Sequence, residues 1–103
     1  MSEKERNIQK EIMLWCGQHD FLCFRCNVGK VKCEDGTWFD SGLCNGFSDL
    51  IVLANNTIYF IEVKTKIGQQ REDQKNFQSI VQSRGYTYIV ARSTKDMEVI
   101  LNG

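Results

Sequence analysis

Apolar residues recur at helical spacing in the first segment of the chain. Four of them fall on one side of a helix drawn over this segment: Ile8, Ile12, Trp15 and Cys16. Ser2 precedes the segment and is a suitable N-cap, while Glu3 and Glu5 suit the positive end of a helix dipole. The pattern predicts a helix over residues 3 to 19 that ends near Gly17.

The most regular strand pattern lies in the middle of the chain. Two apolar runs, residues 49 to 54 and 57 to 64, are separated only by Asn55 and Asn56. Asparagine tolerates the positive φ that a two-residue hairpin turn requires. Both runs are apolar on both faces, which is typical of strands in the middle of a sheet that is covered on each side. We therefore expect a central β-hairpin here.

The remaining segments complete an α/β pattern. We expect a strand at 21 to 28, a hairpin or long loop at 29 to 48, a helix at 71 to 84, a strand at 86 to 91 and a last short element at 97 to 101. This order predicts an α/β fold with a central mixed β-sheet flanked by helices. The length of 103 residues suits one domain spanning residues 1–103.

Composition and charge narrow the class of protein without giving a function. Thirteen Lys plus Arg balance thirteen Asp plus Glu, so no overall positive charge indicates a nucleic-acid partner. No apolar run approaches the roughly 20 residues of a membrane span, and the charged start MSEKER lacks the form of a secretory signal. We expect an intracellular protein that does not enter a membrane.

The predicted hairpin opposes two carboxylates. If Asn55 and Asn56 form the turn, cross-strand partners place Asp49 directly opposite Glu62, with Cβ atoms about 4.5–5.5 Å apart. Lys64 lies two residues beyond Glu62 and shares its face. Opposed like charges destabilise a sheet unless a cation lies between them, and oxygen ligands suit a hard divalent cation. Mg²⁺ is the first candidate.

A third acid is available from the first predicted helix. At about 100° per residue, Glu5 lies about 30° from the centre of the apolar stripe and Glu11 about 90° away. Glu5 is therefore the better candidate, although a helix-dipole role in the first turn would also explain it. With Asp49 and Glu62 it would hold a metal, while Lys64 would orient or deprotonate a water and stabilise charge on a phosphoryl group.

These motifs resemble a known nuclease family. The order helix-Glu5, Gly46-Phe47-Ser48-Asp49 and Glu62-Val63-Lys64 is similar to the PD-(D/E)XK nuclease core, with Ser48 where the family name has proline. Within that superfamily the chain resembles the virus-type replication-repair nuclease (VRR-NUC) domain. Further matching segments are Arg25-Cys26-Asn27-Val28-Gly29 and Gly68 followed by Gln74. The resemblance covers about residues 5 to 90 and implies a restriction-endonuclease-like core.

The resemblance implies a Mg²⁺- or Mn²⁺-dependent enzyme that cuts DNA by attack of water. In that case Asp49 and Glu62 hold the metal, joined by the Val63 carbonyl, and Glu5 binds the metal or positions one of its waters. Lys64 assists the nucleophile. Gln74 orients Lys64 or touches a phosphate, unless it is simply an exposed helix residue.

The resemblance also bears on substrate and assembly. Short stand-alone members, such as those of phages, are expected to be homodimers that act on branched DNA such as four-way (Holliday) junctions. Flap cleavage, sequence-specific cleavage and a non-catalytic DNA-binding or assembly role on the same fold remain alternatives. Residues expected to contact DNA are Arg25, Asn27, Lys30, Lys32, Ser48, Lys66, Arg71 and Lys75.

The five cysteines allow a second interpretation. Cys23 and Cys26, with Cys33 and Cys44, have the spacing of a zinc site. However, strand alternation sends the first two side chains to opposite faces of the sheet. We therefore favour buried, reduced thiols.

Overall fold

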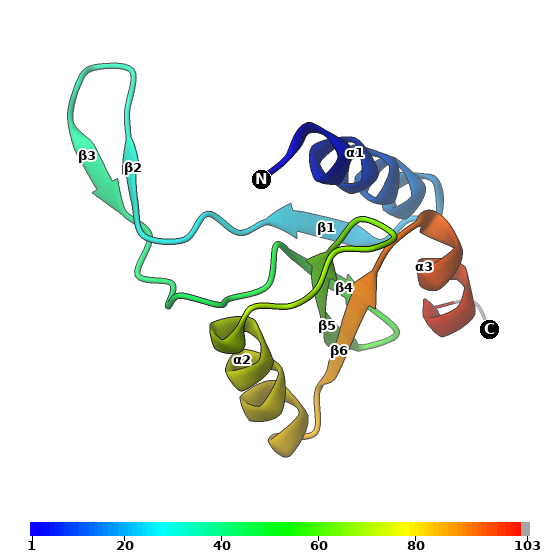
Figure 1. The fold of residues 1–103 in the computed structure, drawn as a ribbon. Coiled ribbons are helices and arrows are strands. Elements are labelled where there is room, and N and C mark those ends of the chain that lie inside the picture. The colour runs from blue at the N-terminus through cyan, green and yellow to red at the C-terminus, as the bar shows by residue number, and fades with distance from the viewer. Residues whose placement is uncertain (102–103) are drawn as a thin grey trace.

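The computed structural model describes residues 1–101 as a layered α/β fold (Figure 1). The helices are α1 (Glu3–Gln18), α2 (Glu72–Ser83) and α3 (Thr94–Leu101). The strands are β1 (Leu22–Arg25), β2 (Lys30–Lys32), β3 (Trp38–Asp40), β4 (Leu50–Ala54), β5 (Thr57–Val63) and β6 (Thr87–Ala91). The predicted order of elements is confirmed, although β1 is shorter than residues 21 to 28 and the last element is a helix that begins at Thr94.

Helix α1 forms where the periodicity predicts it. The Ser2 hydroxyl accepts the Glu5 N–H at 3.2 Å and so caps the first turn. At the other end, His19 is the C-cap and its Nδ1 lies 2.8 Å from the Trp15 carbonyl oxygen. Ile12, Trp15 and Cys16 are buried along one side. The helix thus lies with its apolar stripe on the sheet, as expected.

The central hairpin has the predicted turn and register. Asn55 and Asn56 have φ values of 53° and 62°, and Ala54 pairs with Thr57. The four-stranded sheet has the order β1-β4-β5-β6, in which β5 pairs antiparallel with β4 and parallel with β6. The expectation of a mixed sheet with this hairpin at its centre is confirmed.

The two faces of the sheet are covered unequally. Helices α1 and α3 cover one face and bury the main core, whereas α2 covers the other face over β5 and β6, where Phe77 packs against Phe60 at a ring-centroid distance of 5.8 Å. On the β1 and β4 side of that second face, Leu22, Phe24 and Leu53 are 59%, 52% and 38% exposed. The expectation that the central hairpin is covered on both sides is therefore wrong for β4, because α2 is too far along the sheet to reach it.

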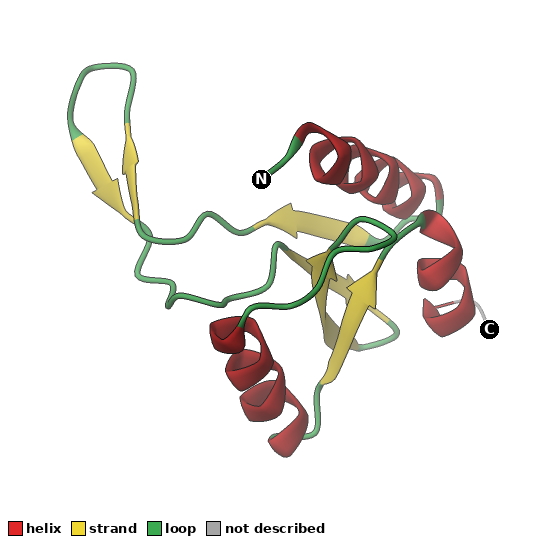
Figure 2. Cartoon of the chain, viewed as in Figure 1, coloured by secondary structure: helices red, strands yellow, loops and turns green. Residues whose placement is uncertain are grey.

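Strands β2 and β3 form a separate two-stranded sheet between β1 and β4 in the sequence. In Figure 1 and Figure 2 this hairpin projects away from the four-stranded sheet and its helices. Its turn is closed by the Gly36 N–H, which donates to the Cys33 carbonyl at 3.0 Å, and by Asp35, whose carboxylate accepts from the Thr37 hydroxyl at 2.6 Å. Of the two possibilities left open for this segment, the hairpin is correct.

Candidate active site

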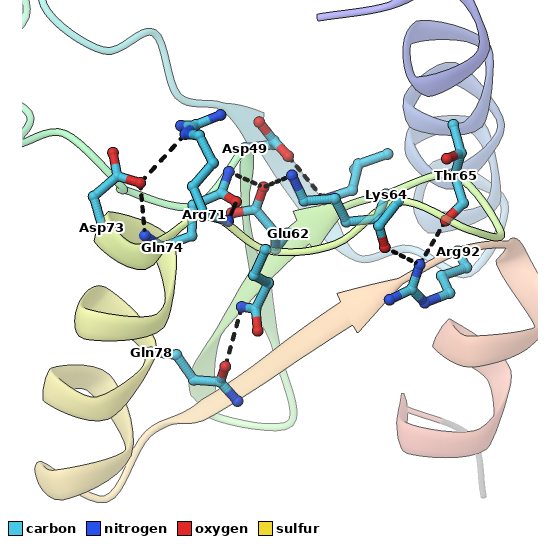
Figure 3. Close-up of polar contacts among 12 residues, drawn as sticks. Asp49, Glu62, Lys64, Thr65, Arg71, Asp73, Gln74, Gln78 and Arg92 are labelled. Atoms are coloured by element: carbon cyan, nitrogen blue, oxygen red, sulfur yellow. Dashed lines mark hydrogen bonds and ion pairs between the residues drawn. The ribbon is translucent and has the colours of Figure 1, made fainter.

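The paired acids lie at one end of the central hairpin, where β4 begins and β5 ends. Asp49 immediately precedes β4, and its Oδ2 accepts the backbone N–H of Val63 at 2.7 Å. This bond joins the two strand ends beyond the last β4–β5 pair, Leu50 with Ile61. The register therefore places Asp49 beside Glu62, and Figure 3 shows the two side chains close to Lys64.

Alternation along β5 separates the core from the site. Ile61 and Val63 point into the apolar core and are fully buried. Glu62 and Lys64 lie on the opposite face, yet they are only 1% and 6% exposed. Lys64 Nζ lies 4.0 Å from Glu62 Oε2. Two ionisable side chains are thus buried beneath α2, one on the strand that supplies the core and one directly after it.

Glu62 is held by two neutral hydrogen-bond donors. Gln74 Nε2 donates to its Oε2 at 2.8 Å, and the Tyr88 hydroxyl donates to its Oε1 at 3.1 Å. Burial, followed by the nearby Asp49 carboxylate, raises the pKa of Glu62 to about 8. Tyr88 and Lys64 act in the opposite direction but do not cancel these effects. In the absence of a cation, Glu62 therefore keeps its proton beside the Asp49 carboxylate up to about pH 8.

The first turn of α2 is placed against the site by a close backbone approach. Gly46 has a φ of 86°, and a methyl group there would overlap the carbonyl oxygen of Asp73. Gln74 Oε1 accepts the Arg71 N–H at 2.9 Å, which fixes the amide so that its nitrogen faces Glu62. Glycine at position 46 is thus needed to bring the Gln74 amide to the carboxylate.

The turn that follows Lys64 is held from β6 and α3. The Arg92 guanidinium donates from Nη1 to the carbonyl oxygens of Thr65 at 2.6 Å and Gly68 at 2.7 Å (Figure 3). The Arg92 N–H in turn donates to Asp96 at 2.8 Å. This arginine fixes the backbone just after Lys64 without touching the lysine itself.

These side chains open into a cavity of about 670 Å³ at the end of the sheet. Glu5 lines the cavity from the first turn of α1, together with Asp49, Glu62 and Lys64. Within residues 1–101, however, no three His, Cys, Asp or Glu side chains lie close enough together to hold a metal ion. Glu5 is thus on the wall of the same cavity, at a greater distance than the predicted three-acid cluster requires.

Comparison with known proteins agrees with this geometry. A family model of the VRR-NUC domain matches residues 3–95. The chain belongs to the VRR-NUC domain family. A solved structure titled "VRR_NUC domain" matches this VRR-NUC chain with a TM-score of 0.74 and 21% identity, covering 98% of this chain and 97% of that one. No curated protein matches it significantly.

The resemblance drawn from the motifs is therefore confirmed, and so is the fold class. VRR-NUC is a nuclease domain family, which makes this chain a member of a nuclease family. At 21% identity the solved structure establishes the shared fold and nothing finer. In the described part of the chain, no helix is both long and apolar enough to cross a bilayer.

The predicted DNA-contacting residues of this VRR-NUC chain separate into three groups. Arg25, Asn27 and Arg71 line the site cavity. The exposed lysines lie elsewhere: Lys30 and Lys32 on the β2–β3 hairpin, Lys66 in the turn after β5, and Lys75 on α2. Ser48 is fully buried, and its hydroxyl donates to the Leu50 carbonyl at 3.1 Å. Contact between Ser48 and DNA is therefore wrong for this structure, because its side chain is used inside the fold.

The role predicted for Gln74 also needs correction. Its amide is 4% exposed and binds Glu62 and the Arg71 backbone, so it orients the carboxylate rather than Lys64 and is not an exposed helix residue. Two further residues of the site were missed. Tyr88, on the strand parallel to β5, donates to Glu62, and Arg92, which directly follows that strand, holds the turn after Lys64. No local spacing links either residue to Glu62 or Lys64. Only the pairing of β5 with β6 brings them there.

All five cysteines are free thiols, but they are not uniformly buried. Cys16 is buried, Cys23 and Cys26 are half-buried, and Cys33 and Cys44 are exposed, which corrects the expectation of buried thiols. Cys26 lines the site cavity, where burial and the Asp49 carboxylate raise the pKa of its thiol to about 11. It is therefore a neutral neighbour of the paired acids.

Proposed function

We propose that this chain is a divalent-metal-dependent endodeoxyribonuclease that hydrolyses phosphodiester bonds in branched DNA. The observation that carries the proposal is the buried Glu62 carboxylate beside Asp49, with the Lys64 ammonium 4.0 Å away, in a cavity of a VRR-NUC fold. A fold does not need a carboxylate in such a place, because burial and the second acid raise its pKa to about 8. A role in binding a catalytic cation would explain why a carboxylate is buried there.

The donor set suits Mg²⁺ or Mn²⁺. Asp49 uses Oδ2 for the Val63 N–H, which leaves Oδ1 as a ligand, and the Glu62 carboxylate faces the same cavity. A hard divalent cation prefers such oxygen ligands, and its charge would relieve the repulsion that raises the pKa of Glu62. Asp49, Glu62 and the Val63 carbonyl would hold it. When bound, it would lower the pKa of water and stabilise negative charge on a phosphoryl group.

Other side chains prepare the site for hydrolysis. The Lys64 N–H donates to the Ala91 carbonyl, and Arg92 holds the Thr65 carbonyl just after it. The Lys64 side chain would orient the attacking water or stabilise charge on the phosphate. Gln74 and Tyr88 hold the Glu62 carboxylate in one orientation through their hydrogen bonds. Glu5 is on the cavity wall, where it would position a water rather than complete the ligand set.

The charges of the cavity support a phosphate-containing substrate once a cation is present. Four acids and four bases line the cavity: Glu5, Asp49, Glu62, Asp73, Arg6, Arg25, Lys64 and Arg71. A bound divalent cation would make the net charge of these lining groups positive. Contacts to phosphates by Arg25 and Arg71 fix position without reading sequence, which suits an enzyme selective for DNA structure.

Cleavage of labelled linear, flap, splayed and four-way DNA tests the proposal, with Mg²⁺, with Mn²⁺ and with chelator. We expect metal-dependent products, with four-way junctions preferred, and loss of cleavage in Glu62→Gln and Lys64→Ala. Glu11→Gln is the matched control, because Glu11 is an exposed acid of α1 that does not line the cavity. Full activity of Glu62→Gln, or cleavage unaffected by chelator, would reject the proposal.

A non-catalytic DNA-binding role is the second candidate. It is favoured by one observation, that the described residues place no three acids close enough to hold a metal ion. The same assay separates the two functions. Junction binding without cleavage under all metal conditions, unchanged by Glu62→Gln, would establish the binding role.

We further propose that the chain acts as a homodimer. The uncovered half of the sheet presents an apolar surface without charged residues, made by Leu22, Phe24, Ile51, Leu53 and Ile58. A two-fold axis through this surface would pair it with itself, and two sites would allow two symmetric cuts. Phe24→Asp should convert the dimer to a monomer in sedimentation experiments. A wild-type monomer at all concentrations would contradict this assembly.

A further inference from the structure

The β2–β3 hairpin is flanked on both sides by segments that line the cavity of the candidate site. The segment from Arg25 to Val28, which leads into β2, lines the site cavity, as does the segment from Asn45 to Phe47, which follows β3. The two strands are joined at their base by the Ser41 N–H, which donates to the Gly29 carbonyl at 2.9 Å. Figure 1 shows the hairpin projecting away from the four-stranded sheet and the helices. Whatever occupies the cavity therefore passes close to the base of the hairpin.

The hairpin exposes an aromatic side chain that the fold does not use. Trp38 is 64% exposed, in contrast to Trp15, which is 6% exposed and belongs to the core. Trp38, Lys30 and Asp40 surround a hollow of about 390 Å³ on one face of the two strands. Leaving a tryptophan in water forgoes the stabilisation that burial gives, and tryptophan is enriched at binding interfaces.

The same face is basic next to the tryptophan. Lys32 pairs directly with Trp38, and Lys30 pairs with Asp40, so alternation places all four side chains on one face. The acid is partly engaged, because Asp40 Oδ1 accepts the Gly42 N–H at 2.9 Å. Two lysines against one acid leave the strand part of this face positive next to Trp38, while the acids Glu34 and Asp35 lie beyond the strands in the turn. A flat π-surface flanked by ammonium groups is the arrangement by which proteins bind a nucleobase and its phosphates.

A second copy of the chain fits this face less well. The face carries two lysines and one acid, so a two-fold contact between two copies could pair one lysine of each copy with an acid and would leave the second lysine of each copy without an opposing acid. The uncharged surface on β1 and β4 has no such obstacle. Charge therefore favours a polyanion as the occupant of the hairpin face.

We infer that the Trp38 face of the β2–β3 hairpin is a stacking site for an unpaired nucleobase of DNA whose neighbouring phosphates enter the site cavity. The inference rests on the proposed function for the identity of the polymer and adds a feature of the substrate, which is unpaired nucleotides next to duplex. Stacking on Trp38 would select DNA that is locally open. Lys30 and Lys32 would bind the flanking phosphates without reading sequence.

The test is DNA binding in chelator, so that no cleavage occurs. The full chain is titrated with a duplex and with the same duplex carrying a short unpaired stretch, while tryptophan fluorescence and anisotropy are recorded. We expect the partly unpaired DNA to quench the exposed Trp38, and Trp38→Phe to remove that quenching. Trp38→Ala should weaken binding to the partly unpaired DNA about tenfold and change duplex binding by less than about twofold. Trp38→Phe should keep most of the preference.

Phe39→Ala is the matched control, because Phe39 is 58% exposed on the opposite face of the same strand and should leave the preference intact. Equal losses on both DNAs in Trp38→Ala would overturn the inference. So would quenching that grows with protein concentration in the absence of DNA, which would assign the face to a second copy. An inactive protein that still shows the Trp38 preference would reject the proposed catalysis alone, and an active enzyme without it would reject only the stacking site.

Discussion

At the end of β5, residues 61 to 63 are all buried, but the two faces are stabilised in different ways. Ile61 and Val63 are 0% exposed among apolar side chains, while Glu62 is 1% exposed between hydrogen-bond donors. Burial of an apolar side chain contributes roughly 1.5–3 kcal/mol to folding, whereas burial of a charge has an energetic cost. The raised pKa of Glu62 is the sign of that cost. The comparison teaches that burial alone does not distinguish the core from the candidate site, and that a buried ionisable group does.

Neighbouring substitutions on β5 should separate activity from stability. Glu62→Gln keeps the shape and the contact with Gln74 but removes the charge, so we expect cleavage to fall on the order of a thousandfold with no loss of stability. Ile61→Ala leaves a cavity in the core and should cost about 2–5 kcal/mol of unfolding free energy. Cleavage rates and urea denaturation of both variants check this contrast.

The contrast would fail in either of two ways. An inactive Glu62→Gln that is also strongly destabilised would mean that the carboxylate is a structural group. A fully active one would mean that the site face has no part in cleavage.

Local pattern was sufficient to predict the central hairpin and the placement of its acids. Asn55 and Asn56 accept the positive φ of the turn, and once they form it, strand alternation alone places Glu62 and Lys64 on one face and Asp49 opposite Glu62. Each of these steps depends on residues close together in the hairpin. The sequence pattern therefore predicted the paired acids and left the test of their function to experiment.

The partners of the acids depend on tertiary packing and were not predictable. Tyr88 is 26 residues from Glu62, and Arg92 is 27 residues from Thr65, so both contacts require that β6 lies parallel to β5. The burial of Ser48 is of the same kind, because its hydroxyl bonds within the β4 entry rather than facing the cavity. Local periodicity carries no information about which strand becomes the next neighbour.

Gly46→Ala should show that the site face of the sheet depends on the close approach of the Gly46 backbone to Asp73. The apolar core face does not depend on this contact. The new methyl group would overlap the Asp73 carbonyl, and the alanine would have to keep an unfavourable positive φ. We therefore expect about 3 kcal/mol of destabilisation and displacement of Gln74 from Glu62. Gly42→Ala is the matched control, since its φ is 74° with no atom within 4 Å, and should cost about 1 kcal/mol. Thermal denaturation measures both. Equal losses would show that strain alone, without overlap, explains Gly46.

Raising the pH should weaken the fold through the site face. The pKa of Glu62 is raised to about 8, so between about pH 4.5 and pH 8 the unfolded chain has lost this proton while the folded chain keeps it. The contribution of this carboxyl group to the free energy of unfolding is therefore complete below about pH 4.5 and is lost as the pH rises towards 8. Over this range the free energy of unfolding should fall by up to about 1.4 kcal/mol per pH unit. Denaturation of the metal-free protein across this range measures the slope.

Glu62→Gln is the control for that slope and should flatten it. Since a cation competes with the same proton, the apparent affinity for Mg²⁺ should increase over the same pH range. A wild-type slope that persists in Glu62→Gln would assign the titration to another group.

Arg92→Ala should have the smallest effect of these substitutions. It tests whether the turn after Lys64 is held in place by Arg92, which lies outside β5. Loss of the guanidinium frees the Thr65 and Gly68 carbonyls, so we expect kcat to fall about tenfold with little change in KM and a loss of about 1–2 kcal/mol in stability. Arg92→Lys keeps the charge without the planar group and should recover only part of the activity. Arg84→Ala, at the end of α2, is the control and should change neither value. The Gly68 N–H donates to the Thr65 carbonyl, and faster hydrogen exchange of this N–H in Arg92→Ala would show that the turn has loosened. Unchanged exchange together with a lower kcat would mean that Arg92 acts on the substrate and not through the backbone after Lys64.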